Sequence, residues 1–270
     1  MYQLPASVHV LATRLRVHEC IRCGVAHRGY RPGCRQRCGQ CGWRYRPDRV
    51  ERELQILRYF CLEIAAHRVA RTLRMSDLPI WQRFMAYRRW MATRAEAEAQ
   101  PLTGELECDE SYFGGRRRGT ARGRAIGRKV VVFGILERGG RVSTVVVPQA
   151  NEAILMAEIQ RRALKGAVFY TDRFRSYQSL KRYGKHLPVD HSLEYVRRGR
   201  RYHRHINGIE GFWSYAKERL RKYHGVSRRH FPLYLKEMEF RFNHRRDDLF
   251  ELLGTHLVRA LFEYPMQYVM

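Results

Sequence analysis

The sequence has few acidic residues, and this shortage is its most unusual property. Its 270 residues include 26 Asp and Glu against 52 Lys and Arg, so the net charge is +26 and the isoelectric point is about 10.5. Solubility does not require such an excess, and repulsion among the positive charges opposes a compact fold unless a polyanion offsets it. The composition therefore indicates a protein that binds nucleic acid.

Long hydrophobic runs and an export signal are also lacking. The longest apolar run, about residues 130–136, is far too short to span a membrane. No basic leader with an apolar core and a cleavage site stands at the N-terminus, which argues against secretion. We see no internal repeat and no low-complexity tract. The hydrophobic content of 44% excludes intrinsic disorder, and the length predicts roughly two domains of about 150 residues each in a soluble intracellular protein.

The seven cysteines are an odd number, and five of them lie within residues 20–41. Without an export signal, such a cluster indicates metal binding rather than disulfides. The pairs Cys20-x-x-Cys23 and Cys38-x-x-Cys41 supply four thiolates to one tetrahedral Zn²⁺, whose closed ligand shell predicts a structural role. Cys34 is a rival ligand, but its use would break the symmetry of the two pairs.

We predict a zinc ribbon over residues 17–47, because this segment has too few apolar residues to form a core by itself. Its basic side chains predict a surface that contacts DNA phosphates. These side chains are Arg22, Arg28, Arg31, Arg35, Arg37, Arg44 and Arg46.

Residues 48–94 are predicted to form a small helical domain that binds DNA or links its neighbours, and residues 95–104 a linker. Helices are expected over about 51–69, 66–73 and 80–90. The last two, with a turn near 74–77, match a helix-turn-helix whose second helix presents Arg83, Arg88 and Arg89 to DNA. The alternative is a helical pair that packs on the zinc ribbon.

From residue 105 the pattern becomes that of an α/β domain, predicted over residues 105–250. A meander of three strands is followed by alternating helices and strands, which is the order of an RNase-H-like fold. The predicted strands are residues 106–113, 130–136, 142–147, 167–170 and 187–189, and the predicted helices are 152–164, 174–183, 205–223 and 232–244.

Three acidic residues in this domain are candidate metal ligands. Asp109 lies within a strand, Asp172 ends a short apolar strand, and Glu210 lies on a long helix. The first and fourth strands of an RNase-H-like sheet are neighbours, so the two aspartates should converge and the helix should bring Glu210 over them. Three carboxylates suit two Mg²⁺ or Mn²⁺ ions that bridge to phosphate.

Other charged residues nearby are secondary candidates. Lys217 follows Glu210 by two helical turns, about 10 Å, so it can contact a substrate phosphate on the same face. Glu107 and Glu110 are rivals of Asp109, but strand alternation places only Glu107 on its face. Asp190, after the fifth strand, is a weaker candidate.

The motifs occur in a fixed order after the cysteine pairs. They are Glu107-Cys-Asp-Glu-Ser-Tyr-Phe-Gly-Gly115, Tyr170-Thr-Asp172 and His205-x-Asn207-x-x-Glu210-x-Phe-Trp213-x-x-x-Lys217. Together they resemble the bacterial insertion-sequence transposases with an N-terminal zinc ribbon and an ISXO-type DDE domain, over most of the chain from about Cys20 to His244. The resemblance implies an enzyme that cuts the ends of a mobile DNA element and joins the freed 3′-OH to target DNA.

The resemblance also bears on the third ligand, the partners and the location. Some members of the family are thought to use Asn in the third position, so Asn207 competes with Glu210, which we favour because a carboxylate adds charge and Lys217 follows at the expected spacing. A homodimer or higher oligomer on double-stranded DNA, in the bacterial cytoplasm and associated with the nucleoid, is expected. The alternatives are a nuclease or resolvase that only hydrolyses DNA and a transposase-derived DNA-binding protein without catalysis.

Two basic runs complete the predicted DNA-binding residues. The segment 116–128, between two strands, is rich in Gly and Arg and is expected to order on DNA, unless it is only a solvated hairpin tip. The arginines of the two runs are Arg116, Arg117, Arg118, Arg197, Arg198, Arg200 and Arg201.

Overall fold

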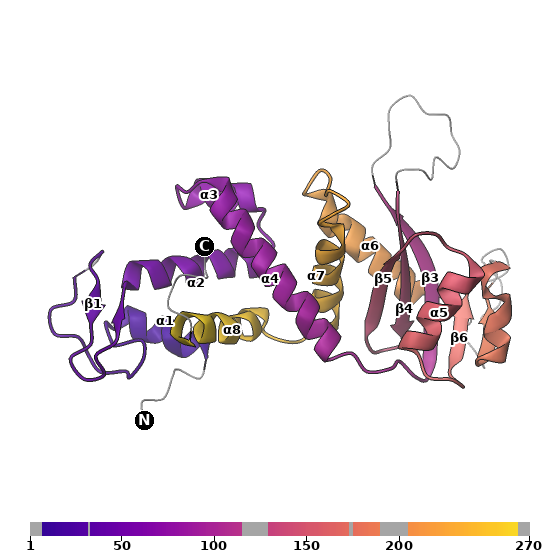
Figure 1. The fold of residues 1–270 in the computed structure, drawn as a ribbon, viewed down its shortest axis with the longest axis horizontal. Coiled ribbons are helices and arrows are strands. Elements are labelled where there is room, and N and C mark those ends of the chain that lie inside the picture. Colours follow the sequence, from indigo (N-terminus) through magenta and orange to yellow (C-terminus); the bar gives the residue numbers. More distant parts are fainter. Residues whose placement is uncertain (1–6, 32, 115–128, 173–174, 190–204, 264–270) are drawn as a thin grey trace. The chain divides into compact units, whose positions relative to one another are not determined.

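The computed structural model describes residues 7–31, 33–114, 129–172, 175–189 and 205–263 (Figure 1). The chain divides into two compact units, one of residues 1–87 with 246–270 and one of residues 88–245. Within the described part, no helix combines the length and the apolar composition needed to cross a membrane.

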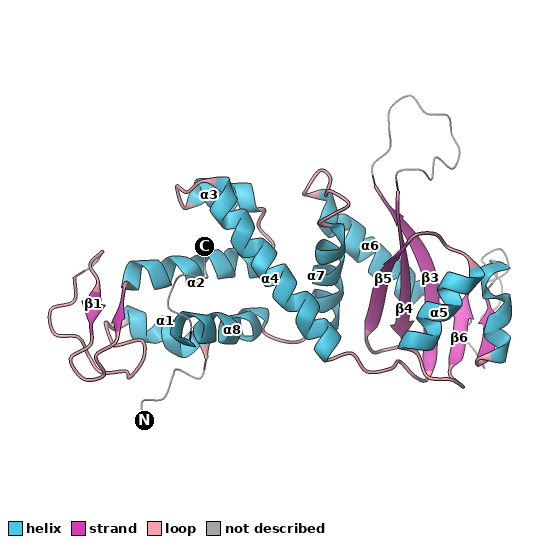
Figure 2. Cartoon of the chain, in the orientation of Figure 1, coloured by secondary structure: helices cyan, strands magenta, loops and turns pink. Residues whose placement is uncertain are grey.

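The first unit contains a small ribbon and several helices (Figure 2). Two short strands, β1 (Gln36–Arg37) and β2 (Arg44–Tyr45), pair antiparallel in the ribbon. The helices are α1 (Val8–Arg16), α2 (Pro47–Cys61), α3 (Ala66–Thr72), the first part of α4 (Asp77–Ala97) and α8 (Leu249–Glu263). The helices α3 and α4, separated by residues 73–76, confirm the predicted sequence of helix, turn and helix.

The second unit is built on a five-stranded mixed sheet. In chain order its elements are β3 (Glu105–Phe113), β4 (Val130–Glu137), β5 (Val142–Val147), α5 (Glu152–Arg162), β6 (Val168–Thr171), the 3₁₀ helix η2 (Arg175–Arg182), β7 (Lys185–Pro188), α6 (Asn207–Arg221) and α7 (Phe231–Asn243). The strand order is β5-β4-β3-β6-β7, and β4 is antiparallel to both of its neighbours. The strands β3 and β6 are parallel neighbours, as predicted.

Alternation along the strands divides the core of the second unit into two layers. One face of the sheet, with Cys108 and Phe133, packs against Leu155 of α5 and Tyr177 of η2. The other face, with Val132 and Tyr170, packs against Ile209, Phe212 and Trp213 of α6 and Leu235 and Met238 of α7. Helices therefore cover both faces, and the order and layering confirm the predicted RNase-H-like α/β fold.

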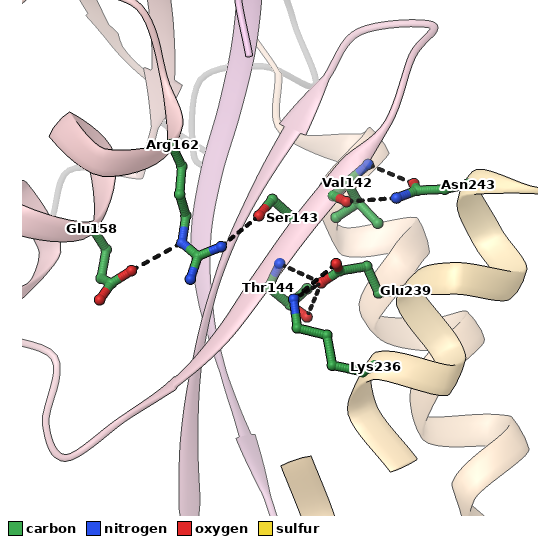
Figure 3. A network of polar contacts seen from close by, with 8 residues as sticks. All are labelled: Val142, Ser143, Thr144, Glu158, Arg162, Lys236, Glu239 and Asn243. Atoms are coloured by element: carbon green, nitrogen blue, oxygen red, sulfur yellow. Dashed lines mark hydrogen bonds and ion pairs between the residues drawn. The ribbon is translucent and has the colours of Figure 1, made fainter. Parts of the chain in front are cut away.

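The edge strand β5 bonds to side chains of α7 instead of a further strand (Figure 3). The Val142 N–H donates to Asn243 Oδ1 at 2.8 Å, and Asn243 Nδ2 donates to the Val142 carbonyl at 2.9 Å. The backbone N–H and the hydroxyl of Thr144 donate to Glu239 Oε2 at 2.7 and 2.6 Å. Lys236 Nζ donates to the same carboxylate at 2.8 Å. These bonds fix α7 and satisfy edge groups that would otherwise pair with another chain.

The structure corrects two details of the sequence analysis and adds the helix α1, for which no prediction was made. The helix expected over 51–69 is interrupted after α2, where Glu63 adopts a left-handed φ of 59°. The helix α4 extends to Ala97, three residues into the expected linker. Residues 1–16 contain the helix α1, whose N-terminus is capped by the Ser7 side chain and whose Val8 and Leu11 are buried.

The boundaries of the two units also differ from the predicted domains. The helix α8 belongs to the first unit, and α4 contributes residues to both units. Within the first unit, α8 contacts α1 closely enough that a Cβ on Gly254 would lie 2.4 Å from Val8 Cβ. Because α1 and α8 are far apart in the sequence, no local sequence pattern predicts that they pack together.

Candidate functional sites

The four predicted zinc ligands lie together in the ribbon. The sulfur atoms of Cys20, Cys23, Cys38 and Cys41 all lie within 4.8 Å of one another. Cys34 is exposed and is not part of this group. Four thiol groups at this spacing fit a tetrahedral zinc site with no open position, which is the structural type of site.

The two cysteine pairs adopt the same turn. The Gly24 N–H donates to the Cys20 carbonyl at 2.8 Å, and the Gly42 N–H donates to the Cys38 carbonyl at 2.9 Å. Both glycines have a left-handed backbone, with φ of 77° and 69°. Glycine tolerates this conformation at no steric cost, so each turn directs its two sulfurs to the same point.

The thiols of the cluster differ in their affinity for protons. Burial raises the pKa of Cys20 to about 12. Burial also raises the pKa of Cys38, but hydrogen bonds from the backbone N–H groups of Cys41 and Gln40 and from the thiols of Cys23 and Cys20 together outweigh it, and the resulting pKa is about 7. A thiolate, the form that binds metal, is therefore accessible near neutral pH.

Most arginines of the ribbon lie on its surface, as the phosphate-binding prediction requires. Arg22 is the exception, because it is half-buried and its guanidinium lies 5.0 Å from the centre of the Trp43 ring. The exposed ones are Arg28, Arg31, Arg35, Arg37, Arg44 and Arg46.

The predicted catalytic acids come from three elements of the second unit. In the parallel pair of β3 and β6, Cys108 pairs with Thr171. Asp109 and Asp172 are the next residues after this pair, so they leave the two neighbouring strands side by side. The helix α6 packs across β3 and β4 and carries Glu210 in its first turn. The structure thus brings the three predicted acids near one another, where β6 ends beside the middle of β3.

Trp213 connects α6 directly to Asp109. Its indole Nε1 donates to Asp109 Oδ2 at 3.1 Å. Its ring lies over Gly134, which is opposite Asp109 in β4 and where a Cβ would be only 2.6 Å from the ring. A glycine at this position is therefore required for the tryptophan to reach the aspartate.

Along the axis of α6, Glu210 lies nearer than Asn207 to Trp213, the residue whose indole contacts Asp109. Glu210 is three residues before Trp213, a rise of about 4.5 Å, and Asn207 is six residues before it, a rise of about 9 Å. Lys217 lies one turn beyond Trp213, with Nζ 5.6 Å from the centre of the Phe113 ring. Asp109 thus faces α6 between Glu210 and Lys217.

The charges of these residues act on one another. Burial raises the pKa of Asp109 to about 6, and the charges of Asp172 and Glu210 contribute to the increase against the lowering effect of the Trp213 hydrogen bond. Burial lowers the pKa of Lys217, and the charge of Asp109 partly restores it. Asp109 is therefore a mostly buried carboxylate that interacts with two further acidic side chains and with Lys217.

The acidic group is more open than the cysteine cluster. Among the described residues, only the four cysteines form a group of three or more metal-ligating side chains whose ligand atoms all lie within 4.8 Å. Two divalent ions about 3.5–4 Å apart need a wider set of ligands than one ion.

The two rival glutamates have other partners. Glu107 lies on the face of Asp109, but it is 1% exposed and both of its oxygens accept hydrogen bonds from protein groups. Glu110 lies on the opposite face, where it accepts a hydrogen bond from Tyr177, and burial raises its pKa to about 7. The alternation predicted for this strand is confirmed.

The structure contradicts the expectation that Arg83 and Arg88 present their charges to DNA. The guanidinium of Arg83 donates to Glu53 from Nε at 2.7 Å, and only 14% of the side chain is exposed. Arg88 is 1% exposed, donates to Glu237 at 2.7 Å and lies 3.8 Å from the centre of the Tyr234 ring. Both are held in the interior by acidic partners. Of the three predicted arginines, Arg89 is the exposed one.

Several predicted residues fall outside the described part of the chain. They are Asp190, Arg116, Arg117, Arg118, Arg197, Arg198, Arg200 and Arg201.

Sequence reasoning missed the residues that support the acids. Trp213 and Gly134 were not assigned a role, although Trp213 stands three residues after Glu210 on the same helix face. Arg138, which binds Glu107, follows β4 in a turn and carries no motif. For Glu107, the position on the same strand face as Asp109 was the one signal that it contributes to the site.

Comparison with known proteins identifies the family. A model of the family described as "ISXO2-like transposase domain" matches residues 101–243, just over half of the chain. An uncharacterized transposase-like protein of Haemophilus influenzae is 41% identical over 104 residues, which cover 38% of this chain and 81% of that protein.

Solved structures with a similar arrangement are distant. The catalytic domain of Mos1 mariner transposase has a TM-score of 0.37 and 12% identity, with 66% of this chain and 88% of that chain covered. The HTLV-2 integrase catalytic core domain, solved in complex with magnesium, has a TM-score of 0.33 and 10% identity, with 54% and 89% covered. On the extent of the family match, the chain belongs to the family of ISXO2-like transposases.

Proposed function

We propose that this protein is a DDE-type transposase that binds the ends of a mobile DNA element, cleaves phosphodiester bonds there and joins the 3′-OH ends to target DNA. The observation that carries the proposal is the convergence of Asp109 and Asp172 from adjacent parallel strands with Glu210 from α6. Residues of this type on these elements suit two-metal phosphoryl transfer.

The three acids are suited to hold two Mg²⁺ or Mn²⁺ ions. Carboxylate oxygens are the ligands these ions prefer, and the charges of Asp172 and Glu210 add to the effect of burial in raising the pKa of Asp109. When bound, the ions would activate the attacking oxygen and stabilise the leaving oxygen. Trp213 holds the Asp109 carboxylate in a fixed orientation.

Glu210 is the third ligand in this proposal. It is one helical turn from the Trp213 anchor, and its charge reaches Asp109. Asn207 is a turn further away, at the start of α6, where it is exposed and can orient the scissile phosphate or a water molecule by hydrogen bonds. Lys217, on the other side of Asp109, is placed to contact a phosphate.

The partner in this proposal is double-stranded DNA, both the element ends and the target. The arginines exposed on the zinc ribbon provide phosphate contacts, and the helix pair α3–α4 is a further DNA-binding candidate. Two element ends must be processed together, so we propose that a dimer or higher oligomer assembles on DNA.

A plasmid carrying the DNA that flanks the coding sequence tests the proposal, since these flanks are the candidate element ends. With Mg²⁺, the purified protein should cleave at the ends and produce joined molecules, whereas Asp172→Asn should do neither and still bind DNA. Asp247→Asn, which changes an exposed aspartate of the first unit, is the matched control and should be active. Cleavage that survives Asp172→Asn would refute the assignment.

A further inference from the structure

Glu107 is a buried carboxylate that lies two residues before Asp109 on the same face of β3. It is 1% exposed, and a buried carboxylate is costly unless it is paired and hydrogen-bonded. Its Oε1 accepts from Arg138 Nε at 2.9 Å, and its Oε2 accepts from the Ile209 N–H at 3.0 Å. His205 Nδ1 lies 3.4 Å from Oε1. Both oxygens are thus engaged by the protein.

The bond to Ile209 closes the N-terminus of α6. The first N–H groups of a helix have no partner within the helix, and a side chain usually caps them. Ile206 at the N-cap position makes no such bond, so Glu107 supplies the acceptor from the neighbouring strand. Its negative charge also lies at the positive end of the helix dipole.

Gly208 permits this close approach. A Cβ at position 208 would lie 2.8 Å from Glu107 Oε2 and 3.0 Å from Leu136 Cδ2. Any larger residue would push the first turn of α6 away from the sheet. The glycine beside Asn207 in the sequence motif therefore has a packing reason.

Arg138 completes the connection from the end of β4. Its Nη2 donates to the His205 carbonyl at 2.7 Å, and its Nη1 donates to Glu105 at 3.0 Å. The guanidinium lies 3.7 Å from the centre of the Tyr170 ring. One side chain thus ties β3, β6 and His205, two residues before α6, together.

We propose that Glu107 and Arg138 are positioning residues of the active site, which hold the first turn of α6 so that Glu210 meets Asp109. Glu210 directly follows Ile209, whose N–H binds Glu107, and precedes by one turn Trp213, whose indole binds Asp109. It therefore lies between two fixed points. The inference rests on the proposed function for its catalytic consequence. The hydrogen bonds that Glu107 and Arg138 make to each other and to residues 205 and 209, which we call the clamp, are a property of the fold.

Glu107→Gln is the direct test. Glutamine has one acceptor oxygen where Glu107 uses two, so either the Ile209 N–H or Arg138 loses its acceptor. The matched control is Glu239→Gln, which alters a buried glutamate that joins α7 to β5 away from α6. If Glu107→Gln fails to fold, Arg138→Lys, which keeps the charge but loses the planar fork, takes its place.

Two readouts separate positioning from simple stability. In Glu107→Gln, hydrogen exchange at the first turn of α6 should accelerate, and the Mn²⁺ concentration needed for half-maximal cleavage should rise about 10–100-fold, as for other residues that support metal ligands. Raising Mn²⁺ should partly restore the rate. Glu239→Gln should leave both readouts as in the wild type.

The outcomes also separate this inference from the proposed function. If exchange and Mn²⁺ requirement in Glu107→Gln match those of Glu239→Gln, the positioning role is refuted. If the wild type itself neither binds Mn²⁺ nor cleaves DNA, the proposed function fails. In that case, faster exchange confined to the first turn of α6 would still support the clamp, and unchanged exchange would overturn it.

Discussion

Asp109→Asn is predicted to stabilise the metal-free protein while it abolishes catalysis. Burial raises the pKa of Asp109 from 3.8 to about 6, so the folded state pays for keeping this carboxylate ionised. A difference of about two pKa units corresponds to roughly 3 kcal/mol, and partial exposure of the side chain reduces this to about 1–3 kcal/mol. The amide is neutral and removes that cost.

The sign of the pH dependence follows from the raised pKa. The folded state binds the proton more tightly than the unfolded state, so this group costs nothing below pH 3.8, and its cost grows as the pH rises towards 6 and is constant above it. The advantage of Asp109→Asn in urea unfolding should therefore be full at pH 8 and shrink clearly at pH 5. Magnesium should reverse the order, since it stabilises only a protein that binds it.

The assay is urea unfolding at pH 5 and 8, with and without Mg²⁺, followed by a probe of the second unit. Asp247→Asn is the control and should unfold like the wild type under every condition. The reasoning is refuted if Asp109→Asn is less stable than the wild type at pH 8 without Mg²⁺. It is equally refuted if Mg²⁺ stabilises both proteins to the same extent.

Three further predictions concern zinc, salt and the third ligand. Zinc analysis should find about one Zn²⁺ per chain, lost in Cys38→Ser and retained in the control Cys34→Ser; full zinc in Cys38→Ser would contradict the assigned cluster. Chelation should unfold residues 17–47 while the second unit persists. The logarithm of DNA affinity should fall steeply and linearly with the logarithm of salt concentration, on random and end sequences alike, and a flat response would mean that the basic residues do not contact phosphates. Glu210→Gln should lose cleavage and joining but keep DNA binding, whereas Asn207→Ala should be weakened only; the reverse order of activity would assign the third ligand to Asn207.

The catalytic fold was predictable because its signals are local. In β3, alternation alone separates Asp109 from Glu110, and the structure places Trp213 on one side and Tyr177 on the other. The apolar strand that ends one residue before Asp172 and the amphipathic helix with Glu210 are likewise visible in the sequence, to within two residues at each end.

Features that depend on distant partners were not predictable. The arginines of α4 look like a basic helix face, but Arg88 is neutralised by Glu237, 149 residues later in the chain. The helix α1 is short and becomes apparent only through its contact with α8. Glu107 looked like a competing metal ligand because Arg138 and the N-terminus of α6, which bind it, lie in other parts of the sequence.

Joining of a labelled element end to a plasmid tests the central claim most directly. An oligonucleotide with the end sequence and a free 3′-OH is incubated with supercoiled plasmid, protein and Mg²⁺, and covalent transfer of the label is measured. The wild type should label the plasmid, and Asp109→Asn and Glu210→Gln should not, although both bind the oligonucleotide. Nicked plasmid without label would indicate a nuclease, and joined product from Asp109→Asn would contradict the proposed active site.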